Sequence, residues 1–104
     1  MINLDLNLKY GPIISDEESD VIFQELNKHL EKGESVTLNF IDVIAMSTKS
    51  AKKIFGQLYF KMKSKEFYDR IIIVNASNTL QEIIYDAIVN YFTSNTDDIK
   101  EYNL

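Results

Sequence analysis

Residues 36–48 read VTLNFIDVIAMST and contain the transition on which the fold depends. The first five, residues 36–40, are rich in β-branched and aromatic side chains and predict a strand. Residues 42–47 predict a loop, and a helix is expected from Thr48 to about Lys65. Its apolar side chains recur at helical spacing and predict a core face made of Ala51, Ile54, Phe55, Leu58 and Met62.

The segment before this transition predicts two strands and a helix. Residues 2–9 alternate strictly between apolar and polar, which is typical of a strand with one face on the core and one face open. A turn at residues 10–12 then leads into a short second strand at Ile13 and Ile14, so we expect an antiparallel hairpin. Ser15 and Glu18 form a capping-box pattern for a helix at residues 16–32.

The segment after the transition predicts one more strand and one more helix. Residues 71–74 read IIIV, and this run, apolar on both faces, favours a central strand. A third helix is expected at residues 79–92, followed by a polar tail at residues 93–104. The prediction is one α/β domain, residues 1–92, with a mixed four-stranded sheet and three helices in the order β-β-α-β-α-β-α.

Composition and charge narrow the classes of function. Hydrophobic residues make up 45% and charged residues 26%, which is typical of a globular domain. The formal net charge of −5 disfavours nucleic acid as a partner. We expect no membrane span, because no apolar run is long enough to cross a bilayer. With no cysteine and no signal-peptide pattern, a cytoplasmic protein is the simplest interpretation.

The residues that usually carry catalysis or bind cofactors are sparse. The chain has one histidine, His29, and three scattered glycines, so neither a catalytic triad nor a phosphate-binding glycine loop is indicated. The acids at residues 16–20 fit the start of a helix far better than a metal site. We therefore expect a protein that is not an enzyme and holds no metal or cofactor.

A cluster of hydroxyls marks the start of the predicted second helix. Ser47, Thr48 and Ser50 can serve as ordinary caps, which is the commoner role of such residues. The same position would stabilise an added phosphate, and six lysines with no acid follow between residues 49 and 65. The lysine run suits either a solvated helix face or a docking surface for an acidic protein.

Several of these stretches resemble STAS domains, the anti-sigma-factor antagonist fold. Residues 38–48, followed by Ala51 and residues 54–56, resemble the central strand, loop and helix start of that family. Residues 11–15 and 67–77 look like the corresponding parts of a STAS-like group associated with histidine-kinase-type ATPases. The similarity spans roughly residues 10–92 and implies a STAS-like fold.

The resemblance implies a regulatory protein-interaction module. It suggests a histidine-kinase-like ATPase as partner and Thr48 as the phosphorylated residue, with Ser47 and Ser50 as further candidates. Ser47 stands where the family has aspartate, and Lys49 and Ser50 replace its small Ser-Gly pair. The predicted partner-binding residues are Met46, Ser47, Thr48, Lys49, Lys52, Lys53 and Phe60.

Two alternatives remain open at this point. One is a structural or homodimer-forming accessory domain without a switch, which would use an apolar strip at Tyr85, Val89 and Phe92 on the third helix. The other is a small nucleotide-binding domain, since some STAS domains are described as nucleotide binders.

Overall fold

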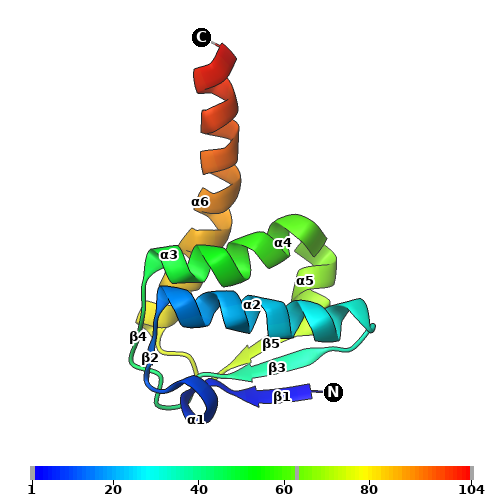
Figure 1. Ribbon diagram of the computed structural model, residues 1–104, viewed down its shortest axis with the longest axis vertical. Coiled ribbons are helices and arrows are strands. Elements are labelled where there is room, and N and C mark those ends of the chain that lie inside the picture. The colour runs from blue at the N-terminus through cyan, green and yellow to red at the C-terminus, as the bar shows by residue number, and fades with distance from the viewer. Residues whose placement is uncertain (1, 63, 104) are drawn as a thin grey trace.

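The computed structural model describes the chain over residues 2–62 and 64–103, with side chains described for residues 2–62 and 65–91. The longer helices lie on one side of a small sheet (Figure 1). The sheet contains β1 (Ile2–Asp5), β3 (Val36–Asn39) and β5 (Ile71–Val74), in the order β1-β3-β5. All three strands are parallel, so a crossover connection that carries a helix joins each strand to the next.

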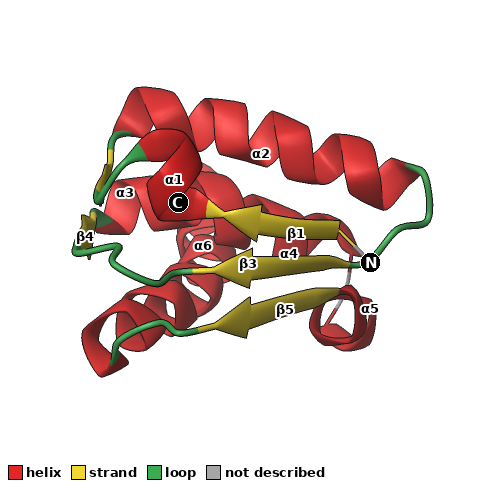
Figure 2. Ribbon diagram, turned by 90° about the horizontal axis from the view of Figure 1, so that it is seen from below, coloured by secondary structure: helices red, strands yellow, loops and turns green. Residues whose placement is uncertain are grey.

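The register places alternate residues of the three strands on the same face. Val36 lies between Ile2 and Ile71, and Leu38 between Leu4 and Ile73. Val36 and Leu38 are completely buried against the helices, whereas Asn3 and Ile72 are exposed on the opposite face. Figure 2 shows this second face of the sheet with no helix in front of it. The open sheet face expected from the alternation at the N-terminus is confirmed.

The predicted four-stranded mixed sheet is wrong. β2 (Ile13–Ile14) does not form a hairpin with the first strand but pairs in parallel with β4 (Ala45–Met46), as a separate two-stranded ribbon. The predicted central strand, β5, is an edge strand, and β3 occupies the centre. The apolar run at residues 71–74 therefore leaves Ile72 partly exposed rather than covering it between two layers.

The first predicted strand is also shorter than expected. After Asp5 the chain turns into the short helix α1 (Leu6–Tyr10), whose first turn is capped by Asp5. The Asp5 carboxylate accepts a hydrogen bond from the backbone N–H of Leu8 at 3.2 Å. Leu6 then faces the core while Leu8 is fully outside it, at 83% exposure.

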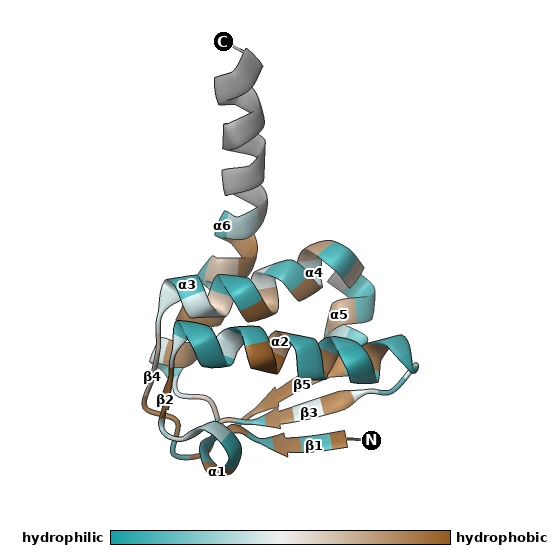
Figure 3. Ribbon diagram, in the orientation of Figure 1, coloured by the Kyte–Doolittle hydropathy of each residue, from teal (hydrophilic) through white to brown (hydrophobic). Residues whose placement is uncertain are grey.

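Helix α2 (Asp16–Glu31) follows the sequence prediction closely. Both hydrogen bonds of the capping box between Ser15 and Glu18 are present. Its outward face is mostly hydrophilic (Figure 3). Four buried side chains at helical spacing pack against the rest of the core: Ser19, Ile22, Leu26 and Leu30.

The predicted second helix consists of three helical segments and is followed by a further helix. α3 (Thr48–Ala51) continues through the π-helical segment η1 (Lys52–Gly56) into α4 (Gln57–Met62). The predicted core face is confirmed, because all five of its apolar residues are buried. A separate helix, α5 (Ser64–Arg70), then leads into β5, whereas the predicted second helix ended at about Lys65.

The last helix, α6 (Asn78–Asn103), packs against η1, α3 and α4. It includes residues 93–103, which were predicted as a tail. Their side chains lie outside the described residues, as do Phe92 and Leu104, so a domain boundary at residue 92 stays a prediction. In the part of the chain that the structure describes, no helix is both long and apolar enough to span a bilayer.

Candidate functional site

The strand β4 leads directly into α3 and fixes the geometry of the predicted site. Met46, the last residue of β4, is buried and anchors this junction in the core. Ser47 is the N-cap of α3, and its Oγ accepts a hydrogen bond from the backbone N–H of Ser50 at 3.0 Å. Thr48 is the first residue of the helix and is exposed.

The starts of α2 and α3 are joined by one carboxylate, that of Asp16. Oδ1 of Asp16 accepts a hydrogen bond from Ser50 Oγ at 2.8 Å and lies 3.4 Å from Ser47 Oγ. Oδ2 lies 3.4 Å from Lys49 Nζ. The hydrogen bond from Ser50, together with the nearby ammonium of Lys49, holds the pKa of Asp16 below its usual value of 3.8. The sequence pattern indicates only a helix start at Asp16, and nothing local in it points to this link.

The three candidate hydroxyls therefore occupy different environments. Ser50 is fully buried, and its hydroxyl is engaged by Asp16 and lies 3.0 Å from Ser47 Oγ. Ser47 is exposed, but its hydroxyl oxygen accepts the hydrogen bond that caps the first turn of α3. Among the described residues, the hydroxyl of Thr48 makes no hydrogen bond, and it faces solvent.

The predicted lysines lie along the seam between α3, η1 and α2. Lys49 is the most exposed, with 73% of its side chain accessible, and it points toward Asp16. Lys53 forms an ion pair with Asp20 of α2 at 3.4 Å, and Lys52 is half-buried. Part of the lysine run thus holds two helices together, and Lys49 remains the most accessible basic group beside Thr48.

Phe60 lies apart from this cluster. It is on α4, roughly 18 Å farther along the helix axis than Thr48 at about 1.5 Å per residue. Its ring packs edge-on against Tyr91 of α6, with 5.8 Å between ring centroids. The structure therefore does not place Phe60 with the other predicted partner-binding residues.

Exposed apolar side chains lie on the ribbon of β2 and β4 that leads into α3. Ile13 of β2 pairs with Ala45 of β4, and the backbone N–H of Ile44 donates to the carbonyl of Pro12 at 2.7 Å. Ile13 is 62% exposed and Ile44 is 74% exposed. Of the apolar residues in the predicted loop at residues 42–47, Val43 and Met46 are buried, whereas Ile44 is not.

The single histidine belongs to the structural framework. His29 lies in the last turn of α2, and its Nδ1 is 3.0 Å from a carboxylate oxygen of Glu34. The contact with His29 lowers the pKa of Glu34. Over the described residues, no three side chains of histidine, cysteine, aspartate or glutamate gather closely enough to hold a metal ion.

The comparisons with known proteins agree with the predicted family. Residues 19–81 match the family described as a STAS-like domain of unknown function (DUF4325), and this match spans more than half of the chain. It extends from α2 through the Ser47–Thr48 junction to the first turn of α6. No curated protein and no solved structure matches the chain. On the match to residues 19–81, the chain belongs to the STAS-like domain family.

Proposed function

We propose that this STAS-like domain is a non-catalytic regulatory module that binds a partner protein at one end of the fold. This docking end consists of Ile13, Ile44, Ser47, Thr48 and Lys49. The observation that carries the proposal is the exposed Thr48 hydroxyl at the start of a helix, in the same loop-to-helix segment as exposed Ile44. Contiguous exposed apolar side chains next to a polar rim are typical of protein-interaction sites.

Phosphorylation of Thr48 is the proposed switch. A phosphate would add nearly two negative charges beside the first turn of α3, close to Lys49 and to the Asp16 carboxylate. Lys49 would be drawn toward the phosphate and Asp16 would be repelled by it, so the junction of α2 and α3 would change together with the surface charge. Thr48 is favoured over Ser50 because a kinase has direct access to an exposed hydroxyl but not to a buried one.

The proposed partner is a histidine-kinase-type ATPase, which the family resemblance suggests as both binding partner and kinase. An affinity-tagged chain would be purified gently from its native host, and its companions and the peptide containing residues 47–52 would be examined by mass spectrometry. Recovery of such an ATPase, or phosphate on Thr48, supports the switch. A lone, unmodified chain would favour an accessory domain instead.

Substitutions at Thr48 test the switch quantitatively once the companion is in hand. Thr48→Glu should weaken the complex by about tenfold, because it adds charge to the apolar docking end, whereas Thr48→Val should bind almost normally. Thr79→Glu is the matched control, since Thr79 is an exposed threonine near the start of another helix, α6. Isothermal titration calorimetry measures all three variants, and equal affinities for wild type and Thr48→Glu would rule out a switch at Thr48.

A further inference from the structure

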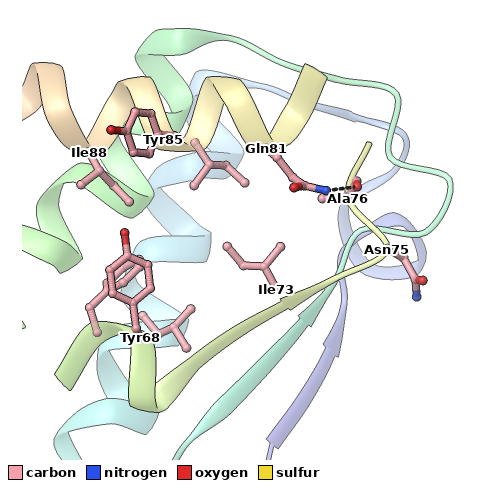
Figure 4. Close-up of a pocket in the computed structure, with 10 residues that line it drawn as sticks. Tyr68, Ile73, Asn75, Ala76, Gln81, Tyr85 and Ile88 are labelled. Carbon is pink, nitrogen blue, oxygen red and sulfur yellow. Dashed lines mark hydrogen bonds between the residues drawn. The ribbon is translucent and has the colours of Figure 1, made fainter. Parts of the chain in front are cut away.

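A second surface lies along the free edge of β5. A groove with a volume of about 420 Å³ separates β5 from α5 and α6 (Figure 4). All ten residues that line it are uncharged. Ile73 of β5 points into the groove, toward Tyr85 and Ile88 of α6, while Tyr68 of α5 closes one side (Figure 4). Tyr68 and Tyr85 are both more than half exposed, so the groove opens to solvent.

The edge of β5 beside this groove has no strand partner among the described residues. β5 pairs only with β3, and no strand lies beside its other edge (Figure 2). Edge strands are usually protected by charged side chains, proline or bulges. β5 has none of these, because it consists of three isoleucines and a valine, which favour strand pairing.

The groove continues over α6 into an acidic rim. A neighbouring depression shares Gln81 and Tyr85 with the groove and is also lined by Glu82 and Asp86. No lysine or arginine lines either hollow, and residues 78–91 of α6 contain no basic residue. Neither Glu82 nor Asp86 forms an ion pair within the part of the chain that the structure describes.

We propose that the β5 edge and this groove bind an extended, apolar segment of a partner protein that carries lysine or arginine beside it. The segment would add a fourth strand to the sheet, with alternate side chains in the groove and its basic residues near Glu82 and Asp86. A second copy of this chain fits less well, because symmetric pairing through β5 would bring the same acidic rims together. The inference does not depend on the function proposed for the docking end.

The probe is a fluorescently labelled peptide, KKITVTIKK, in which apolar residues alternate and lysines flank them. Two control peptides are KKITPTIKK, whose proline removes a backbone donor, and EEITVTIEE, whose ends carry the wrong charge. Fluorescence anisotropy measures binding to the whole chain at low and high salt. We expect the probe to bind, the proline peptide to lose at least about tenfold in affinity, and the acidic peptide to bind more weakly still.

Charge reversal in the chain identifies the site. Glu82→Lys/Asp86→Lys should weaken binding of the probe by about tenfold and strengthen binding of the acidic peptide. The single reversal Glu82→Lys is matched by the control Glu17→Lys, which makes the same change in net charge at an exposed residue of α2. Glu17 forms no ion pair among the described residues, so this control should leave the affinity nearly unchanged. Tyr85→Lys is a second, independent variant, because Tyr85 is mostly exposed and its replacement leaves the core intact.

Hydrogen exchange distinguishes strand addition from binding elsewhere. Saturating probe should slow the exchange of amide protons at Ile71–Val74, since the added strand would bond to the free edge. The proposal is overturned if the probe does not bind, if it binds without protecting β5, or if Glu82→Lys and Glu17→Lys weaken it equally. It is equally overturned if sedimentation shows a dimer whose formation alone protects β5, which would assign the edge to a second copy.

Discussion

The side chain of Asp16 has two structural roles, and a local sequence pattern predicts only one of them. By position it is the first residue of α2, where a negative charge is stabilised by the helix dipole. In three dimensions the same carboxylate accepts from Ser50 and approaches Lys49, both on the helix that begins at the candidate site. The helix pattern predicted the first role. The second role depends on how two distant helix starts meet, which no local pattern contains.

The lowered pKa of Asp16 leads to a prediction about pH. A carboxyl whose pKa is lower in the folded state contributes stability that is full above its unfolded value, 3.8, and is lost as pH falls through the folded value. We therefore expect Asp16→Asn to be less stable than wild type at pH 7, with a difference that shrinks below pH 3.8. Urea unfolding at neutral and acidic pH measures it.

Asp69→Asn provides the control for this experiment, because Asp69 is exposed on α5 and makes no ion pair among the described residues. A pH profile of Asp16→Asn that stays parallel to that of wild type down to pH 2 would refute the role of the Asp16 carboxylate.

At the scale of elements, period and capping patterns predicted helices better than strands. The capping box of α2 is confirmed. The core face of the helix at residues 48–62 is also confirmed, because its apolar pattern repeats over several turns. The strand predicted from the N-terminal alternation is wrong after Asp5. Leu6 and Tyr10 are also spaced to lie on one face of a helix, and the cap formed by Asp5 favours that helix. Four residues of IIIV predicted a strand correctly but not its position in the sheet, which depends on the neighbours of β5.

The packing of η1 against α6 depends on the absence of a side chain at Gly56. A Cβ built on Gly56 would lie 2.8 Å from the Cβ of Tyr91, which is closer than such atoms approach in real structures. Gly56→Ala should therefore lower the free energy of unfolding by about 1–3 kcal/mol. Alanine is ordinarily preferred to glycine within a helix by about 1 kcal/mol, so the expected sign is opposite to the usual one.

A double-mutant cycle measured by urea unfolding tests whether Tyr91 is the cause. In a Tyr91→Gly background the same Gly56→Ala substitution should cost much less, because glycine at position 91 removes the Cβ as well as the ring atoms that the new methyl group would meet. An identical cost in the two backgrounds would show that the substitution acts through something other than this contact.

At the scale of the whole molecule, Arg70 connects segments that are distant in sequence. Its guanidinium donates to the backbone carbonyls of Leu30 and Glu34, the latter at 3.0 Å, and to the Glu66 carboxylate at 2.8 Å. These contacts fasten the end of α2, the turn before β3 and helix α5 to the start of β5. In the sequence, the stretch around Arg70 carries only the family resemblance, whereas these contacts give Arg70 a structural role.

Replacing Arg70 by lysine keeps the charge but removes the fork of donors that reaches three acceptors. We expect Arg70→Lys to lower the free energy of unfolding by about 1–2 kcal/mol, because at least one partly buried carbonyl loses its donor. The control is the reverse substitution at an exposed site, Lys32→Arg, which should leave the free energy of unfolding nearly unchanged. Calorimetry measures the thermal unfolding of both variants. An Arg70→Lys variant as stable as wild type would argue against a stabilising role for the Arg70 hydrogen bonds.

The strand order β1-β3-β5 follows the order of synthesis, and this bears on how the chain folds at the ribosome. Paired residues such as Ile2 and Val36, or Val36 and Ile71, are about 35 residues apart, so the sheet assembles by slow closure of long loops. Each new strand joins an edge that already exists, and none has to insert between two others. In a nascent chain that stalls before residue 71, the edge of β3 that normally pairs with β5 would have no partner strand. This edge, which contains Val36 and Leu38, could then pair with a strand of another nascent chain.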